Sequence, residues 1–466
     1  MVARLGLFLS RTIGRCMPDP LILALGLTIL TAILALTFGY AGISRSDAAT
    51  QLIGGWWSSK GIWLFLNFSM QMALILVTGY ALADSPIVRR LLSSIARIPK
   101  TPGQAAAIVG FVAAATGLVN WGLGLIVGAL LARDVGRCME KRGRPSHFPL
   151  LCAAGYVGLL VWHGGLSGTA ALKTSTAAEA KTIFGSDLLA SLASQGFADG
   201  IPLSATTFSG MNLLISGGLL LIIPLILWML APRPSDCRSL SQVDAQPMKD
   251  SPQPPISSNE SWGVVGTIFS IVIALALILG FIFFLTDDKR GILRLGPNEF
   301  NALMLGIGLI LHGSPIAYAR SIERAAKGCA GILIQFPLYA GILMMLKQSG
   351  LMEDVARFAA ESSTETTLPF FTFISAGVVN FFVPSGGGQW GVQGPIAIQS
   401  AIEAGVPLPK MLLSVSYGDE LTNMLQPFWA LPLLAITGVR AKDIVGYTAV
   451  VMIVAAIWIS LWLLVW

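Results

Sequence analysis

Two stretches of this sequence continue without a charged residue for longer than a single membrane span requires. Residues 101–132 and 366–402 contain no Asp, Glu, Lys or Arg. As straight helices they would be about 48 and 55 Å long, because an α-helix rises about 1.5 Å per residue. The hydrocarbon core of a bilayer is only about 30 Å thick. Each stretch must therefore either tilt and overhang the bilayer or turn back within it.

The composition is typical of a membrane protein. Of the 466 residues, 54% are hydrophobic and 12% are charged, whereas a soluble domain carries about 25% charged residues. So few charges could not cover the surface of a soluble protein of this size. A typical cytosolic enzyme, a disordered protein and a nucleic-acid-binding protein are thereby excluded, even though the net charge is +6. The five cysteines show neither disulfide-framework nor metal-ligand spacing.

The N-terminal apolar run, residues 21–40, is interpreted as a retained transmembrane helix. Its length of about 20 residues suffices to cross a bilayer. The hydrophobic region of a signal peptide is usually shorter, and no clear A-x-A cleavage site follows this run. Arg4, Arg11 and Arg15 precede it, and this basic flank predicts a cytoplasmic N-terminus.

Eight further apolar runs predict an all-α polytopic membrane protein. They lie at about residues 62–83, 148–172, 201–231, 262–286, 298–318, 328–346, 408–433 and 444–466. The expected division is a first membrane repeat (1–231), a Pro-rich cytoplasmic linker (232–260), a linking transmembrane helix (261–297) and a second repeat (298–466). Residues 173–200 are rich in Ser and Ala and predict an external amphipathic segment.

Charge placement decides how the two long stretches lie. Basic residues flank the first stretch on both sides: Arg89, Arg90, Arg97 and Lys100 before it, and Arg133, Arg137, Lys141, Arg142 and Arg144 after it. Short basic loops stay in the cytoplasm, so residues 104–132 are predicted to form a re-entrant hairpin with both ends inside. Glu353, Asp354, Glu361 and Glu365 precede the second stretch and Glu403 follows it. The absence of a Lys/Arg cluster agrees with a second hairpin, residues 366–402, whose ends both lie outside.

Three weak sequence matches at similar offsets predict an internal repeat. Gly117-Leu-Val-Asn120 matches Gly377-Val-Val-Asn380, and Gln71-Met-Ala-Leu matches Gln335-Phe-Pro-Leu. The third match, between His163-Gly-Gly-Leu and Gly418-Asp-Glu-Leu, keeps the same order along the chain. Because the first repeat begins inside and the second outside, the repeats are predicted to be inverted. Inverted repeats with broken elements are typical of secondary transporters, whose site lies near the bilayer midplane.

The second hairpin contains a Pro-Ser-Gly-Gly-Gly sequence at its centre. A helix cannot continue through it cheaply, because Pro costs about 3 kcal/mol and each Gly about 1 kcal/mol. We expect the helix to restart near Gln389, with free N–H groups and a positive dipole end that suit a carboxylate. The glycines would allow close backbone approach and positive φ. The alternative is a simple loop. The predicted substrate-binding residues here are Asn380, Ser385, Gly386, Gly387, Gly388, Gln389, Trp390 and Gln393.

The first hairpin contributes a second candidate binding segment. Gly124 and Gly128 are explained by close packing of helices. That explanation does not cover Asn120, which is a polar residue within the uncharged stretch. Asn120, Trp121 and Gly122 are therefore predicted to bind substrate.

Two spans contain polar, Gly-containing interruptions near their centres. One is His163 to Thr169, and the other is Tyr417 to Asn423. An ionisable residue at this depth is costly and functional by default, although it can also be a buried structural group. Asp419, Glu420, Thr422 and Asn423 are predicted to serve the coupling cation, and His163 and Ser167 the substrate. If the cation is Na⁺, its predicted surroundings are Asn120, Asn380, Asp419, Thr422 and Asn423.

Two motifs resemble the bacterial short-chain fatty acid transporter family, within the larger ion-transporter superfamily. They are Pro384-Ser-Gly-Gly-Gly-Gln-Trp-Gly-Val-Gln-Gly-Pro395 and Tyr417-Gly-Asp-Glu-Leu-Thr-Asn-Met-Leu-Gln-Pro-Phe-Trp429. The resemblance covers nearly the whole chain. It implies uptake of small monocarboxylates such as acetoacetate or butyrate, a homodimer, two inverted repeats with re-entrant hairpins, and elevator-like motion.

Together these features predict a cation-coupled symporter of the bacterial inner membrane. The coupling ion would be Na⁺ or H⁺, and no other cofactor is expected. A transporter of other organic anions, such as C4-dicarboxylates, and an anion channel remain alternatives. The second carboxylate of a dicarboxylate would need an additional cationic side chain, and the hairpins contain no Lys or Arg. No nucleophile–base pair is readable, so an enzyme has little support.

Overall fold

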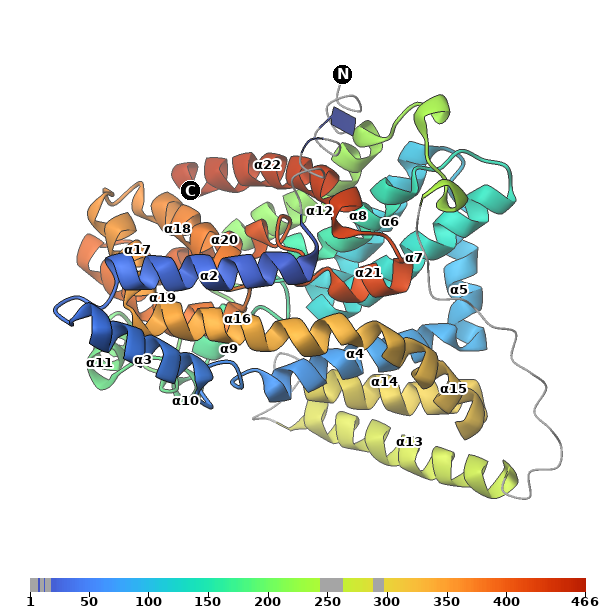
Figure 1. Ribbon diagram of the computed structural model, residues 1–466, viewed down its shortest axis with the longest axis horizontal. Helices are drawn as coiled ribbons and strands as arrows, with labels where there is room; N and C mark the ends of the chain where they lie inside the picture. The colour runs from blue at the N-terminus through green and yellow to red at the C-terminus, as the bar shows by residue number, and fades with distance from the viewer. Residues whose placement is uncertain (1–6, 9–11, 13–17, 244–262, 288–296) are drawn as a thin grey trace.

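The computed structural model describes residues 7–8, 12, 18–243, 263–287 and 297–466. These residues form helices and connecting turns without a strand, so the predicted all-α fold is confirmed (Figure 1). The N-terminal arginines and most of the predicted linker, residues 244–260, lie outside the described part of the chain.

The helices of the first half end at α12, and the second half begins at α13. The first half contains α2 (Pro20–Phe38), α3 (Arg45–Trp57), α4 (Leu66–Asp84), α5 (Pro86–Ala96), α6 (Pro102–Val119), α7 (Trp121–Lys141), α8 (Phe148–Tyr156), α9 (Thr169–Thr174), α10 (Ala177–Ala180), α11 (Ser186–Ser194) and α12 (Gly210–Leu230). The second contains α13 (Gly263–Thr286), α14 (Pro297–His312), α15 (Pro315–Ala326), α16 (Ala330–Gln348), α17 (Leu351–Glu361), α18 (Leu368–Phe382), α19 (Gly386–Ala404), α20 (Leu408–Thr422), α21 (Leu431–Thr437) and α22 (Ala441–Val465).

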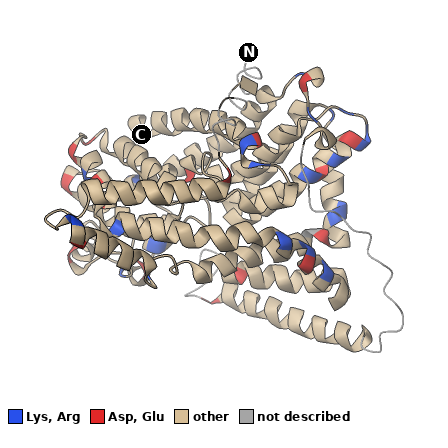
Figure 2. Ribbon diagram, in the orientation of Figure 1, with Lys and Arg blue, Asp and Glu red and all other residues tan. Residues whose placement is uncertain are grey.

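Several helices are built for a lipid surrounding. Within the described residues, six helical stretches are long and apolar enough to cross a bilayer, and α4 with α5, bent by 81°, would make a seventh. Helix α13 exposes large apolar side chains such as Phe269 and Phe283, which water would disfavour. Figure 2 shows most charged residues near the ends of the long helices, with uncharged bands between.

The first predicted hairpin is present as α6 and α7. The backbone leaves the helix only at Asn120, which is extended (φ −155°, ψ 131°). The two arms pack so closely that a Cβ on Gly124 would lie 2.6 Å from the Cα of Gly117. One turn further along each arm, a Cβ on Gly128 would lie 3.0 Å from the Cβ of Ala113. These pairings show that the arms run antiparallel.

The hairpin brings its two basic flanks together. Arg142 Nη1 donates to the carbonyl oxygen of Arg97 at 2.8 Å, and Arg144 Nη1 donates to that of Pro99 at 3.3 Å. The loop that precedes α6 and the loop that follows α7 therefore lie side by side. Two basic flanks on the same face of the membrane would have to lie side by side in this way.

The second predicted hairpin is formed by α18 and α19. The side-chain amide of Gln389 donates to the carbonyl oxygen of Ala376 at 2.9 Å, and that of Gln393 donates to Ser375 Oγ at 2.9 Å. The helix restarts at Gly386, so the expected restart near Gln389 was wrong by one turn. Ser385 causes the earlier start, because its hydroxyl caps the helix by accepting a hydrogen bond from Gly388 N at 3.2 Å.

Both predicted helix breaks exist, but one is displaced. After α8, a short 3₁₀ turn (Val157–Leu160) and an irregular segment, 161–168, contain His163 as expected. Helix α20 instead continues through Thr422, and the irregular segment is 423–430. Pro427 explains the displacement, since it supplies no amide hydrogen and restricts the preceding residue. Asp419 and Glu420 thus lie in the last turns of a helix.

Other span boundaries also need correction. The predicted span 298–318 is two helices, because the chain turns between α14 and α15 at Gly313, whose φ is +64°. The helix predicted from residue 201 begins only at Gly210. The inverted repeat remains a prediction: Asn120 sits at a hairpin tip, whereas its counterpart Asn380 lies in the last turn of α18.

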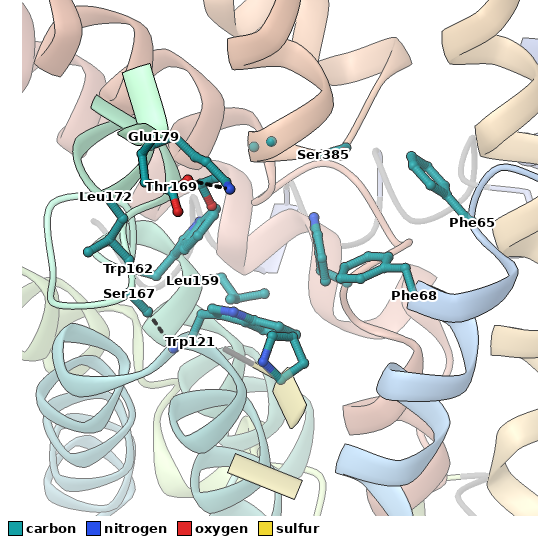
Figure 3. A pocket seen from close by; sticks show the side chains of 15 residues that line it. Phe65, Phe68, Trp121, Leu159, Trp162, Ser167, Thr169, Leu172, Glu179 and Ser385 are labelled. Carbon is teal, nitrogen blue, oxygen red and sulfur yellow. Dashed lines mark hydrogen bonds and ion pairs between the residues drawn. The ribbon is translucent and has the colours of Figure 1, made fainter. Parts of the chain in front are cut away.

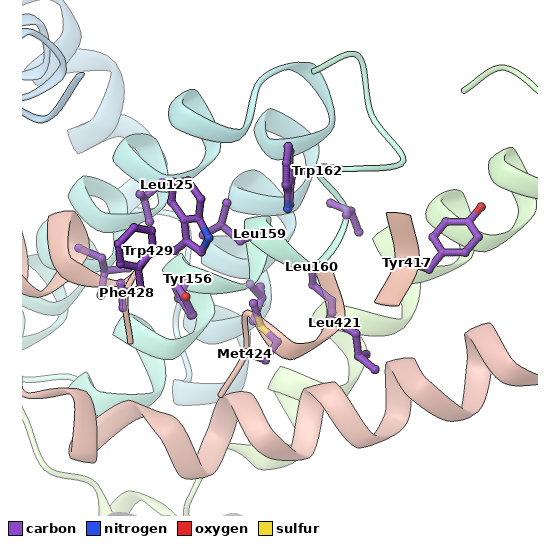
Figure 4. Packing of buried hydrophobic residues seen from close by; sticks show 14 of the residues in the cluster. Leu125, Tyr156, Leu159, Leu160, Trp162, Tyr417, Leu421, Met424, Phe428 and Trp429 are labelled. Atoms are coloured by element: carbon purple, nitrogen blue, oxygen red, sulfur yellow. The ribbon is translucent and has the colours of Figure 1, made fainter. Parts of the chain in front are cut away.

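Tight packing at the centre holds the broken elements in place. Helices α18 and α20 approach so closely that a Cβ on Gly418 would lie 2.2 Å from the carbonyl oxygen of Phe373. Figure 4 shows the buried side chains around the first break and the second, including Tyr156, Leu160 and Met424. The irregular segments therefore lie inside protein rather than in lipid, as membrane depth demands.

The hairpin arrangement predicts the accessibility of engineered cysteines. In a cysteine-free background, Ser94→Cys and Lys141→Cys should both resist a membrane-impermeant thiol reagent added to intact spheroplasts, because both flanks are predicted to lie on the cytoplasmic face. Ser362→Cys, before the second hairpin, should be labelled. Labelling of position 94 but not 141, or the reverse, would make α6 and α7 an ordinary crossing and contradict the model of two re-entrant hairpins.

Candidate substrate site

A cavity of about 510 Å³ lies where the tips of the two hairpins meet. Trp121 enters it from the first hairpin, and Ser385, Gly386 and Gly387 form its wall from the second (Figure 3). The remaining lining residues come from α4 and the residue before it, α9, α10, the start of α14, the 3₁₀ turn after α8 and the irregular segments: Phe65, Phe68, Leu159, Trp162, Ser167, Thr169, Leu172, Lys173, Glu179, Pro297 and Trp429.

Aromatic rings make up much of the cavity wall. The rings of Trp121 and Trp429 meet edge to face with centroids 5.2 Å apart, and Phe68 meets Trp429 at 6.1 Å. Trp162 stacks on His163 with centroids 4.4 Å apart. Such a wall favours an apolar tail, while a few polar groups set the orientation of a ligand.

The tip of the second hairpin gives the cavity its polar edge. The first N–H groups of an α-helix have no acceptor within that helix, so the start of α19 presents donors and a positive dipole end. A Cβ on Gly386 would lie 2.9 Å from Trp162, and one on Gly388 would lie 2.9 Å from Leu343. A Cβ on Gly387 would meet only Thr169, at 3.5 Å. Gly386 and Gly388 therefore allow close packing, and Gly387 leaves open space in the cavity. None of the three has the positive φ that was expected.

The tip of the first hairpin is stabilised by its own side chains. The carbonyl oxygen of the Asn120 side chain accepts hydrogen bonds from Gly122 N at 2.9 Å and Leu123 N at 3.2 Å. Trp121 N donates to Ser167 Oγ at 3.1 Å. Asn120 thus caps α7 from a buried position, and only Trp121 of the three predicted residues lines the cavity.

His163 connects the cavity to two buried carboxylates. Its Nε2 accepts a hydrogen bond from Ala170 N at 3.1 Å, so Nδ1 carries the proton and donates to Asp419 Oδ2 at 2.8 Å. The backbone N–H groups of His163 and Gly164 donate to Glu420 Oε2 at 2.8 and 3.4 Å. Asp419 Oδ1 and Glu420 Oε1 find no hydrogen-bond donor among the described residues. Unneutralised carboxylates are costly in this environment, so the pair suits a cation or a proton.

Thr422 and Asn423 belong to a separate polar cluster. The side-chain amide of Asn380 donates to Thr422 Oγ1 at 2.9 Å and to Asn423 Oδ1 at 3.0 Å. Thr422 Oγ1 donates to the carbonyl oxygen of Gly377 at 2.9 Å. The cluster ties the second hairpin to the second break, whereas the side chain of Asn120 accepts its hydrogen bonds from the start of α7.

The structure brings some of the predicted substrate-binding residues together. Of these, Trp121, Ser167, Ser385, Gly386 and Gly387 line the cavity. The other predicted substrate residues lie behind it: Asn120, Gly122, His163, Asn380, Gly388, Gln389, Trp390 and Gln393. The aromatic lining and the charged pair Lys173 and Glu179 were missed. Of these missed residues, only Trp429 could have been found from the sequence, since it is the last residue of the second motif quoted above.

Comparison with known proteins decides the family. A model of the short chain fatty acid transporter family matches residues 1–466. The chain belongs to this family. A candidate short-chain fatty acid transporter of Escherichia coli (strain K12) is 38% identical over 453 residues, covering 96% of each chain. One from Haemophilus influenzae is 36% identical over 469 residues, covering 98% of each chain.

Two solved transporter structures resemble this short-chain fatty acid transporter family member along most of its length. The Alcanivorax borkumensis YdaH transporter has 17% identity and a TM-score of 0.47, covering 96% of this chain and 97% of that one. Neisseria gonorrhoeae MtrF has 16% identity and a TM-score of 0.46, covering 98% of each chain. Both TM-scores are below 0.5, so the fold and site described above rest on this chain alone.

The open space at Gly387 predicts the effect of a side chain there. Gly387→Val should lower substrate uptake at least about tenfold, because the new side chain projects into the cavity while its Cβ meets no close neighbour. Gly391→Val is the matched control, since a Cβ at Gly391 meets nothing within 4 Å on the same helix. Equal amounts of folded protein should be confirmed by size-exclusion chromatography. Normal uptake by Gly387→Val would remove the second hairpin tip from the site.

Proposed function

We propose that the chain is a secondary active transporter that imports small monocarboxylates, such as acetoacetate or butyrate, across the bacterial inner membrane. The observation that carries this proposal is the cavity at the meeting point of the hairpin tips, with an aromatic wall and a helix N-terminus at its edge. Its volume of about 510 Å³ lies within the range of about 300–1,000 Å³ for small-molecule sites.

The cavity matches the two ends of a short fatty acid. The carboxylate would meet the Ser385 hydroxyl and the first backbone N–H groups of α19, where the dipole favours an anion. The short apolar tail would lie against Trp121 and Trp429. Broken helices that present such ends to a substrate are common in secondary transporters.

The buried carboxylates support coupling to a cation. His163 contacts both carboxylates, and its ring stacks on Trp162, which lines the cavity. His163 therefore links the proposed ion site to the substrate cavity. The coupling ion would be Na⁺ or H⁺, in symport with the substrate. Asp419 is the first candidate, since it is held by the His163 side chain that stacks on Trp162 of the cavity wall, whereas Glu420 is held by backbone N–H groups.

The charge of the wall favours monocarboxylates over C4-dicarboxylates. Lys173 supplies a cationic group that the hairpins lack, but Glu179 balances it. A dicarboxylate would bring two negative charges to a wall with no net charge. The family resemblance further supports a homodimer and an elevator-like movement, and the basic residues before the first span support a cytoplasmic N-terminus; we include all three in the proposal.

Reconstitution tests the proposal directly. Proteoliposomes containing the protein should show counterflow of labelled butyrate or acetoacetate, and unlabelled succinate should compete poorly. Accumulation against a gradient should appear when either a Na⁺ or a proton gradient is imposed, which identifies the coupling ion. Flux that never saturates and never exceeds the imposed substrate gradient would indicate an anion channel instead.

Replacing one carboxylate separates coupling from binding. Asp419→Asn keeps the size of the side chain and removes its charge, so gradient-driven accumulation should be lost while saturable counterflow persists. Ser414→Ala, on the same helix and away from both carboxylates, is the control for folding. Accumulation by Asp419→Asn with its normal ion dependence would assign Asp419 a structural role.

A further inference from the structure

The cavity contains one charged pair to which the proposed function assigns no contact with the substrate. Lys173 Nζ lies 2.7 Å from Glu179 Oε2, and both residues line the cavity. Their side chains are 45% and 30% exposed, so neither is held in the core. Of the described residues that line the cavity, Lys173 is the only Lys or Arg. The pair therefore lines the cavity that an anionic substrate would enter.

The fold directs Lys173 toward the tip of the second hairpin. Thr169 and Lys173 are four residues apart in α9, so they share one face of that helix. Thr169 is the residue nearest to Gly387, at 3.5 Å from the position of its Cβ. In Figure 3 Glu179, the partner of Lys173, lies beside Thr169. Lys173 therefore lies one helical turn from the residue that faces the N-terminus of α19, and it lines the same cavity as Gly386 and Gly387.

Glu179 offers Lys173 the same chemical group that the substrate would offer. A carboxylate on Lys173 forms a charge-assisted hydrogen bond, whether it belongs to the protein or to a ligand. An exposed ion pair of this kind adds little to the stability of a fold. It is also weak enough to be exchanged for an incoming carboxylate that is held at the same time by a helix N-terminus.

We propose that Lys173 binds the carboxylate of the transported acid and that Glu179 forms its ion pair with Lys173 only while the cavity is empty. The inference rests on the proposed function, because it takes a small monocarboxylate as the substrate. The carboxylate of the arriving substrate replaces Glu179 as the partner of the Lys173 ammonium group. No proton is transferred, and no covalent bond forms or breaks. Lys173 then sets the preference for acids over uncharged molecules of similar shape, and Glu179 sets the affinity.

Equilibrium binding of labelled butyrate to the purified, full-length protein tests this exchange. Lys173→Met should raise Kd about tenfold or more, the scale of a lost charged hydrogen bond. Lys173→Arg should stay close to the unchanged protein. Glu179→Gln should lower Kd about two- to fivefold, since it removes a competitor held as weakly as an exposed ion pair. Lys181→Met, an exposed lysine of the same segment outside the cavity lining, should change nothing.

The double variant makes the test specific. If Glu179 acts only through Lys173, Lys173→Met with Glu179→Gln should bind like Lys173→Met alone. Unchanged affinity in Lys173→Met, unchanged affinity in Glu179→Gln, or a gain from Glu179→Gln that survives without Lys173 would each overturn the exchange. If the unchanged protein neither binds nor transports butyrate or acetoacetate, the proposed function itself fails, which is a different result from a wild-type transporter with an indifferent Lys173.

Discussion

The whole architecture depends on one constraint: a peptide group at membrane depth needs a hydrogen-bond partner that lipid cannot supply. The chain breaks its helices at two hairpin tips and in segments 161–168 and 423–430, and protein groups satisfy these breaks. Leu166 N donates to the carbonyl oxygen of Leu118 at 2.7 Å. The Tyr156 hydroxyl lies 2.9 Å from the carbonyl oxygens of Asn423 and Gln426. The segments 161–168 and 423–430 are therefore held by hydrogen bonds to the helices beside them, α6 and α8.

The same broken backbone also surrounds the proposed functional centre. Unwound backbone at His163 and Gly164 supplies the N–H groups that hold Glu420, and the imidazole of His163 holds Asp419. On its other side the imidazole stacks on Trp162, which lines the cavity. A movement of the cavity wall would thus reach the carboxylates through a single stacked pair. The proposed coupling between substrate and cation follows from that continuity.

The sequence predicted the features that charge and length control. The basic flanks of α6 and α7 identified the first hairpin, and the Gly and Pro content of the second identified its tip. Boundaries were less certain, because Ser385 and Pro427 act through local backbone geometry that composition does not reveal. The role of Asn120 could not be read from its polarity, since a capping residue and a ligand-binding residue look the same in sequence. Lys173 was missed because only the folding of α9 against α19 brings it to the cavity.

The central claim is that both hairpin tips and α9 surround one substrate site, and protection from a thiol reagent tests it most directly. In a cysteine-free background, Ser385→Cys and Thr169→Cys should react with a small maleimide, and saturating butyrate should slow both reactions with the same half-maximal concentration. Ser186→Cys, an exposed residue outside the cavity lining, should react at an unchanged rate. Modification of positions 385 and 169 at the same rate with and without butyrate, in protein that still transports it, would contradict the account.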